Sequence, residues 1–484
     1  MLLTLVNFIP VIPEVFVLFM ALVSLMVGIF LQQYPQISYY LAQVTLIIST
    51  WITWHVFAYF NFPTACTFDK LFVVDRLSVY LKLFIYLSVF FSFIYAREYN
   101  NERKISVTEF YSLGLLSLLG MMILVSSCNL LTLFLGLELF SLPIYAMVAM
   151  YRQKTRCLEA SMKYFITSAV ASGMLLYGIS MIFGATKSLD LTQVTRVISS
   201  TSLNQHLVLI VGLVFITAGV AFKLGAAPFH MWVPDVYEGA PSSVTLFIST
   251  APKIATYAML IRLFMGTMPI LQVQWHEMLT VVAILSMIIG NFTAIVQSNI
   301  KRMLAYSSIA HMGYMLLGVL CGTREGYAAG MFYIITYSLM SIGAFGMITL
   351  MSHDNFEAES IRDFAGLNNR NPWLAFMMML ILFSLAGVPP LVGFIAKVNI
   401  LDSLIQVHLV WLAVLAVLLA AVGVYYYIRV VKVMYFEKTS FQFKPIQSSL
   451  EMKIAISLNG LAILFVGLFP GWLYTFSYWA FHSA

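Results

Sequence analysis

Charged residues are scarce in this sequence. Only 10% of the 484 residues are Asp, Glu, Lys or Arg, whereas about a quarter are charged in a typical soluble domain. Apolar residues make up 61% of the chain, and the mean hydropathy is +0.92. This composition excludes the soluble globular classes. We predict an all-α polytopic membrane protein whose helices pack against lipid and against each other.

Cysteine and histidine are scarce as well. The eight histidines include no two mid-helix positions spaced to bind a haem, and the four cysteines form no C-x-x-C motif and no paired spacing: Cys66, Cys128, Cys157 and Cys321. We therefore predict no metal site, no disulfide framework and no cofactor site in this chain. The net charge of +6 comes from basic residues scattered over loops, so it indicates no nucleic-acid partner.

Long apolar runs divide the chain into segments that can each cross a membrane, here called crossings. Because about 20 apolar residues span a bilayer, the pattern predicts about fourteen transmembrane helices. The first run contains Pro10, Pro13 and Glu14 and has no basic region before it, so we interpret it as a retained helix and not as a cleavable signal peptide. The predicted extents are 8–31, 38–60, 76–96, 110–127, 129–150, 159–183, 207–228, 241–266, 276–297, 301–320, 327–350, 372–401, 408–435 and 453–478.

The charge of the loops predicts an orientation. The even-numbered loops carry only Lys70, Lys187, Arg196 and Arg324. By the positive-inside rule the richer, odd-numbered loops are cytoplasmic. An even number of helices then puts both termini on the outer side. The basic residues of the odd-numbered loops are Arg97, Arg103, Lys104, Arg152, Lys154, Arg156, Arg362, Arg370, Lys438 and Lys444.

Five ionisable residues lie inside predicted crossings: Glu138, Lys163, Lys223, Lys253 and Lys397. An ionisable group at mid-membrane is costly, so it usually faces a partner or a water-filled path. A row of lysines beside a carboxylate suits a proton relay, because each lysine can gain and lose a proton. The alternative for any single lysine is that its apolar stem lets the ammonium group reach the membrane surface.

Two further residues are ambiguous. His230 lies in the polar segment PFHMWVPDVYEGAP, residues 228–241. Its ordinary pKa of about 6.5 suits proton exchange at neutral pH, but a structural role fits equally well. Lys82, in the third predicted helix, belongs to no motif, and we interpret it as reaching the membrane surface.

A weak internal repeat is visible. Residues 160–167 resemble residues 329–336, and two crossings five helices apart are broken by Gly and Pro, at 223–228 and 385–390. Units offset by an odd number of helices have opposite topology, which is typical of transporters with paired broken helices. The alternative is that short apolar matches arise by chance and that the prolines only kink helices. The repeat predicts N-terminal helices at 1–109, a first five-helix repeat at 110–266, a second at 276–435 and a C-terminal helix at 436–484.

Five segments occur in one order over residues 135–401 and carry a family resemblance. They are LGLELFSLPIYAMVA, RCLEASMKYFITSAVASG, FKLGAAPFHMWVPDVYEGAPSSVTLFISTAPKIA, NIKRMLAYSSIAHMGYML and FSLAGVPPLVGFIAKVNIL. Together they resemble the antiporter-like subunits of respiratory complex I, and PFHMWVPDVYEGAP is similar to the N-type branch. The M-type branch has glutamate where Lys397 stands, and the L-type branch ends in a long lateral helix for which this sequence leaves no room.

The resemblance implies a proton-translocating subunit of NADH:quinone oxidoreductase in the bacterial inner membrane, with both termini periplasmic. Electrons would pass through FMN and iron–sulfur clusters of partner subunits to quinone. Glu138 and Lys163 would form an ion pair, and Lys223 would be the central residue that holds the proton. Lys253 would be the connecting residue of the pathway, and Lys397 would release protons outwards. The alternatives are a subunit of a multi-subunit cation/proton antiporter and a purely structural membrane module. The lysines indicate that the transported ion is the proton, because a site for sodium would be rich in carboxylates.

Overall fold

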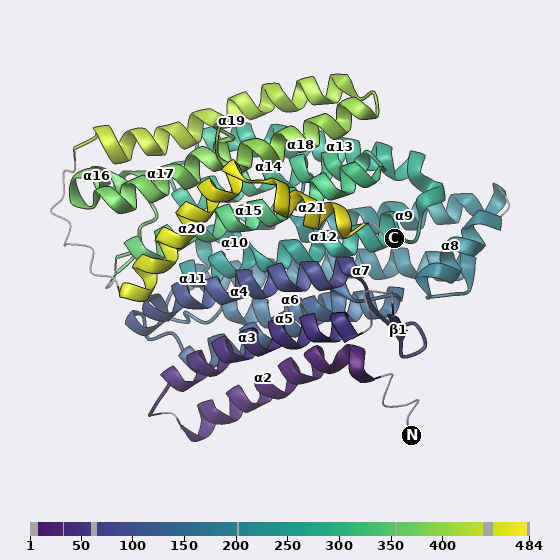
Figure 1. Cartoon of the computed structure of the whole chain (residues 1–484), viewed down its shortest axis with the longest axis horizontal. Helices are drawn as coiled ribbons and strands as arrows, with labels where there is room; N and C mark the ends of the chain where they lie inside the picture. The colour runs from purple at the N-terminus through teal and green to yellow at the C-terminus, as the bar shows by residue number, and fades with distance from the viewer. Residues whose placement is uncertain are drawn as a thin grey trace.

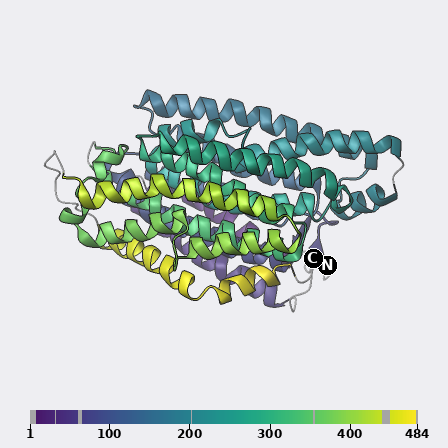
Figure 2. The same cartoon turned by 90° about the horizontal axis from the view of Figure 1, so that it is seen from above.

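The computed structural model describes residues 8–31, 33–59, 65–200, 203–353, 356–438 and 449–481. Within these ranges the chain is a bundle of long helices, which Figures 1 and 2 show from two sides. Thirteen helical stretches of the described part are long and apolar enough to cross a membrane. The interrupted pair α17 (Pro372–Ala386) and α18 (Val392–Gln406) adds a further crossing. The predicted all-α polytopic fold with about fourteen crossings is confirmed.

The crossings follow the chain in order. They are α2 (Ile12–Phe30), α3 (Gln36–Tyr59), α4 (Arg76–Glu102), α5 (Val107–Val125), α6 (Leu130–Val148), α7 (Thr155–Thr186), α9 (Leu203–Leu224), α11 (Ser242–Ile248) with α12 (Ala251–Phe264), α13 (Gln272–Ile295), α14 (Ile300–Leu320), α15 (Arg324–Met351), α17 with α18, α19 (Val410–Phe436) and α20 (Leu450–Leu468). Shorter elements are η1 (Ile9–Val11), the antiparallel hairpin of β1 (Ala65–Thr67) and β2 (Phe72–Val74), α8 (Leu191–Ser200), α10 (Trp232–Gly239), η2 (Pro269–Leu271), η3 (Ile361–Phe364), α16 (Leu367–Arg370) and α21 (Gly471–Trp479).

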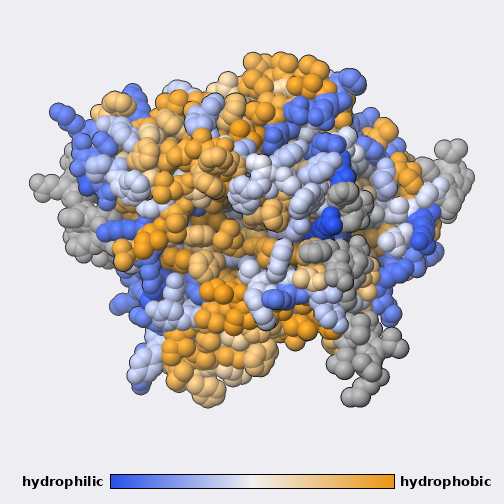
Figure 3. Space-filling view, in the orientation of Figure 1, coloured by the Kyte–Doolittle hydropathy of each residue, from blue (hydrophilic) through white to orange (hydrophobic). Residues whose placement is uncertain are grey.

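Apolar side chains form a broad belt over the middle of the bundle, and hydrophilic residues gather toward its two ends (Figure 3). Helices α2, α7, α13 and α19 contribute many exposed large apolar side chains to the surface. Helices α12, α14 and α15 are almost entirely buried. The outer helices therefore provide a surface suited to lipid or to neighbouring subunits, and the central ones can hold polar groups away from it.

The predicted crossing 372–401 is two helices, in agreement with its predicted break, because Gly387 and the two prolines after it interrupt the backbone ladder. Other predicted boundaries are wrong. The predicted helix 453–478 is also two helices, α20 and α21, which meet at Pro470. The hairpin and the helices α8 and α10 have no counterpart in the prediction, because they are too short to leave an apolar period. Figure 1 places the start of α2 and the end of α21 at the same end of the bundle.

Candidate functional site

Two crossing helices, α9 and α17, end at a glycine inside the bundle. Helix α9 ends at Leu224 and Gly225 follows with a φ of +73°, whereas α17 ends at Ala386 and Gly387 follows with a φ of +87°. Glycine adopts this left-handed conformation without steric cost, and the nearby prolines prevent the helix from continuing. A Cβ atom on Gly387 would lie 2.9 Å from Nζ of Lys397, so this glycine also makes room for the ammonium group.

Lys223, in the last turn of α9, has a buried ammonium group whose side chain is 8% exposed. Its Nζ donates to Oγ of Ser168 at 2.8 Å and to Oγ of Ser141 at 3.1 Å, and it lies 3.4 Å from the hydroxyl oxygen of Tyr145. No ion pair of the described residues includes Lys223. A cation held by neutral hydroxyl groups can lose its proton without leaving an unpaired carboxylate behind.

Glu138, on α6, lies near Lys223 and not near Lys163. Its carboxylate accepts a hydrogen bond from Ser172 on α7, and Ser141, one turn further along α6, contacts Lys223. Ser172 lies nine residues beyond Lys163, or about 13 Å along the helix axis. Among the ion pairs of the described residues, none joins Glu138 to Lys163. The expected direct contact between these two side chains is therefore wrong for this structure.

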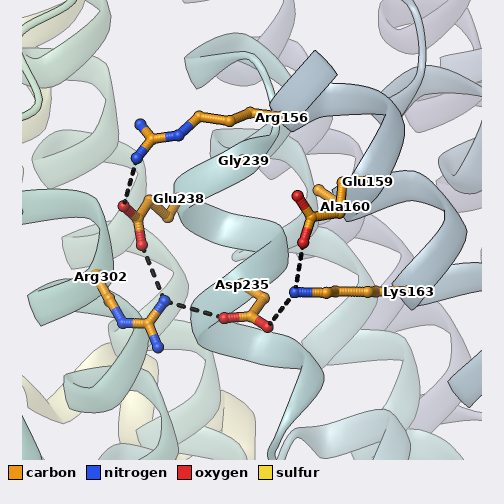
Figure 4. A pocket seen from close by; sticks show the side chains of 8 residues that line it. All are labelled: Arg156, Glu159, Ala160, Lys163, Asp235, Glu238, Gly239 and Arg302. Carbon is orange, nitrogen blue, oxygen red and sulfur yellow. Dashed lines mark hydrogen bonds and ion pairs between the residues drawn. The ribbon is translucent and has the colours of Figure 1, made fainter. Parts of the chain in front are cut away.

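Lys163 instead lines a cavity of about 130 Å³, whose lining side chains Figure 4 shows. Its Nζ lies 2.8 Å from Glu159 and 3.1 Å from Asp235. Arg302, on α14, donates to Asp235 and to Glu238, each at 2.9 Å. Burial alone would raise the pKa of the Asp235 carboxyl, but Lys163 and Arg302 together hold that pKa below its ordinary value. These ion pairs connect α7, α10 and α14.

Lys253 links the first break to the second half of the bundle. It lies in the first turn of α12 and is 3% exposed. Its Nζ donates to Oγ of Ser308 on α14 and, at 3.3 Å, to the carbonyl of Leu224. Leu224 is the residue after Lys223, so Lys253 contacts the same end of α9 at which Lys223 lies.

His311, on α14, belongs to the same polar interior, although sequence reasoning did not single it out. Its Nδ1 lies 2.7 Å from the hydroxyl oxygen of Tyr333, and its Nε2 lies 3.1 Å from that of Tyr427. Tyr427 also bonds Ser307, the neighbour of Ser308. The only signal in the sequence is the polar pattern S-S-x-x-H inside an apolar helix, which places the serines and the histidine within one turn.

Lys397, on α18, contacts the second break. Its Nζ donates to the carbonyl of Ala386 at 2.7 Å and lies 3.3 Å from the carbonyl of Leu385. Both carbonyls belong to the last turn of α17 and have no helical donor beyond the break. The side chain also lines a mainly apolar cavity of about 260 Å³ and lies 5.4 Å from the centre of the Tyr314 ring.

Two other residues behave differently from the lysine row. His230 is buried after the first break, its Nδ1 has no hydrogen-bond partner among the described residues, and no hydrogen bond of that part of the chain joins it to a lysine. Lys82 does not reach the membrane surface. Its Nζ lies 2.5 Å from Oε1 of Glu14 on α2, and both side chains are at most 3% exposed. The interpretation that Lys82 reaches the membrane surface is therefore wrong, because a buried carboxylate compensates its charge.

In the ranges that the structure describes, no three or more His, Cys, Asp and Glu side chains are arranged to bind a metal ion. The four cysteines are free, and two of them are buried.

Comparisons with known proteins agree with this architecture. A family model described as NADH:quinone oxidoreductase/Mrp antiporter, transmembrane, matches residues 127–423. The NADH-quinone oxidoreductase subunit N of Coxiella burnetii is 76% identical over 98% of this chain and 99% of its own length. That of Thioalkalivibrio sulfidiphilus is 49% identical over 96% of this chain and 97% of its own.

Solved structures show the same fold. A chain of respiratory complex I from Thermus thermophilus has a TM-score of 0.82 at 29% identity and covers 96% of this chain and 98% of its own length. A chain of the Mrp complex from Dietzia has a TM-score of 0.83 at 19% identity, with 97% of both chains covered, and shows the fold alone. The chain therefore belongs to the NADH:quinone oxidoreductase/Mrp antiporter family, in the branch formed by subunit N of NADH-quinone oxidoreductase.

Proposed function

We propose that this chain is a proton-translocating membrane subunit of a proton-pumping NADH:quinone oxidoreductase, assembled with the other subunits of bacterial complex I. FMN and iron–sulfur clusters in partner subunits would carry electrons from NADH to quinone. The observation that carries the proposal is the row formed by Lys223, Lys253 and Lys397, whose ammonium groups are enclosed by hydroxyl and carbonyl oxygens. Buried lysines with neutral partners are suited to repeated protonation and deprotonation.

In the proposed route, protons pass through the centre of the bundle. A proton on Lys223 would reach Lys253 through water at the end of α9, where Lys253 contacts the carbonyl of Leu224. From Lys253 the route follows α14, on which Ser308 and His311 are less than one turn apart. Water in the 260 Å³ cavity beside Tyr314 would complete the path to Lys397, which would release protons outwards.

Electrostatics would control the loading of Lys223. Glu138 lies across Ser141, Ser168 and Ser172 from the ammonium group, so a small separation of α6 from α7 changes the field at Lys223. Lys163 would act at the cavity of Figure 4, where Asp235 fixes it, and not as the direct partner of Glu138. His230 would serve the first break either as part of the proton relay or as a structural residue.

The two five-helix units at 110–266 and 276–435 would be inverted repeats. The matched breaks at Gly225 and Gly387 support this assignment. So does a pair of matched helix starts: Asn129 begins α6 and Asn299 begins α14 with side-chain caps, and each forms an isolated antiparallel bridge to a later segment. With the odd-numbered loops cytoplasmic, both termini would be periplasmic.

Gentle solubilisation followed by affinity purification of the tagged chain tests the assignment. We expect flavin and iron–sulfur absorbance to accompany the chain, together with NADH:quinone reductase activity. A chain that purifies only with other antiporter-type membrane subunits, without NADH oxidation, would instead support the cation/proton antiporter alternative and overturn the proposal.

A further inference from the structure

Two of the four cysteines approach each other at one end of the bundle. Cys66 lies in β1, within the connection between α3 and α4, and Cys128 lies in the connection between α5 and α6. Both thiols are reduced in the structure, and Cys66 is exposed whereas Cys128 is partly exposed. We propose that these two residues form a disulfide bond in the cell, made by exchange with the disulfide of a thiol-oxidising protein in the outer compartment.

Backbone pairing holds the two cysteines on one face of the hairpin. In the register of β1 with β2, Cys66 lies opposite Val73. At the other edge of β2 an antiparallel bridge forms, in which the amide of Cys128 donates to the carbonyl of Leu71 at 3.2 Å. Positions 71 and 73 share a face because side chains alternate along a strand, so their cross-strand neighbours Cys66 and Cys128 point to the same side. Cysteine spacing along the chain predicted no disulfide framework, because this hairpin creates the pairing.

The side chains meet on that face. A side-chain hydrogen bond joins the thiols of Cys66 and Cys128, and the charged guanidinium group of Arg262 interacts with both sulfur atoms. Arg262 also donates to the two carboxylate oxygens of Asp75, at 2.7 and 2.8 Å, and to the carbonyl of Val125 at 3.2 Å. Asp75 directly follows β2 and Val125 ends α5, so one arginine fixes both segments that bring the cysteines together.

The exchange proceeds in two steps, and Cys66 reacts first because it is the exposed thiol. Its thiolate attacks one sulfur of the oxidising protein's disulfide, which forms a mixed disulfide and releases one thiol of that protein. Burial raises the pKa of the Cys128 thiol to about 12, and the nearby Arg262 guanidinium opposes this rise. Cys128 then loses its proton, attacks the Cys66 sulfur and releases the second thiol. Two electrons and two protons thus pass from this chain to the oxidising protein.

Both cysteines lie on the outer side in the proposed orientation. They belong to the second and fourth connections between crossings, which are among those poor in basic residues. Figure 1 shows the hairpin at the end of the bundle where α2 begins. Disulfides form and persist in the bacterial periplasm but are rare in the cytosol. The inference therefore rests on the proposed orientation and not on proton transport.

Counting the thiols of the chain in cells tests the proposal. Cells are precipitated in acid, which stops thiol exchange, and the tagged chain is denatured with a polyethylene-glycol maleimide before or after reduction. Each modified thiol slows the chain by one step in a denaturing gel. We expect all four cysteines to be modified after reduction, but only Cys157 and Cys321 without it. Modification of all four without reductant would overturn the disulfide.

Serine variants identify the two partners. Cys66→Ser and Cys128→Ser should each show three modified thiols both with and without reductant, because the remaining partner is then free. Cys321→Ser is the matched control, since this cysteine is buried and outside the pair. It should show one modified thiol without reductant and three with it. A Cys66→Ser or Cys128→Ser chain that still differs between the two conditions would show a different pairing and overturn the proposal.

A membrane-impermeant maleimide tests the side of the membrane. In the Cys128→Ser variant, Cys66 should be labelled in right-side-out spheroplasts and not in inverted vesicles. Labelling in inverted vesicles alone would place the pair in the cytoplasm and overturn its oxidation in the outer compartment. NADH-driven pumping is measured separately on inverted vesicles of the wild type, so failure of the disulfide and failure of the proposed function give different results.

Discussion

Replacing Lys223 with Met separates a proton-carrying lysine from a structural one. The ammonium group contacts three hydroxyl groups and forms no ion pair within the part of the chain that the structure describes. Hydrogen bonds to a charged group contribute roughly 1.5–3 kcal/mol each, and burying one ion costs several kcal/mol. The two effects oppose each other. We therefore expect Lys223→Met to change the free energy of unfolding by no more than about 2 kcal/mol.

A lysine that staples helices through an ion pair would behave differently. Breaking a buried pair costs about 3–5 kcal/mol, because the partner charge stays uncompensated. Since no carboxylate of the described residues forms an ion pair with Lys223, the complex should assemble normally in Lys223→Met. Lys223→Arg should also assemble, but arginine keeps its proton in the working pH range, so neither variant should pump.

The assay uses inverted membrane vesicles, with NADH-driven quinone reduction and acidification of the lumen measured on the same sample. Native gels and thermal unfolding of the complex report assembly and stability, and Lys432→Met on α19 serves as the control for an exposed lysine. We expect pumping to fall at least tenfold in both Lys223 variants. Wild-type pumping by Lys223→Arg would show that deprotonation of this residue is not part of the mechanism.

Glu138→Gln keeps the hydrogen bond to Ser172 but removes the charge near the central lysine, so coupled reductase activity and pumping should fall while complex levels stay normal; pumping at the wild-type rate would contradict the electrostatic role. Lys397→Ala should lose most activity, whereas Lys397→Glu should keep part of it, because a protonated carboxyl group can still donate to the carbonyls of the second break; equal, wild-type-like rates in vesicles would place the outward path elsewhere. Glu14→Gln and Lys82→Met should each lower the unfolding free energy of the complex by about 3–5 kcal/mol, and the double variant should regain most of it; simply additive losses in thermal unfolding would show that the two charges are not coupled.

The crossings and the two breaks could be predicted from the sequence because both depend on local chemistry. An apolar run of about 20 residues has one stable arrangement in a bilayer. Gly225 and Gly387 were recognisable because proline follows each within a few residues, and their positive φ values agree with that pattern. The hairpin of β1 and β2 left no such signal, since each strand has only three residues.

The partners of the ionisable residues could not be predicted in the same way. The family resemblance implies that Lys163 pairs with Glu138, yet such a contact requires the two side chains to lie at the same height along the axis of α7. Nine residues separate Lys163 from Ser172, the side chain that contacts Glu138. Lys82 and Glu14 form a buried ion pair that was not expected. The two residues lie on separate helices, and the sequence around neither of them indicates the other as its partner.

The kind of partner distinguishes the two sets of buried charges in this chain. Lys82 has a carboxylate at 2.5 Å, so removing its proton would leave an unpaired negative charge in the bundle. Lys397 has two backbone carbonyls, which accept from the ammonium group but bear no net charge. The breaks supply those carbonyls by ending α17 beside the lysine. Interrupting a helix thus creates a site where a lysine can be held in place in both protonation states, which a continuous helix with an ion pair would not allow.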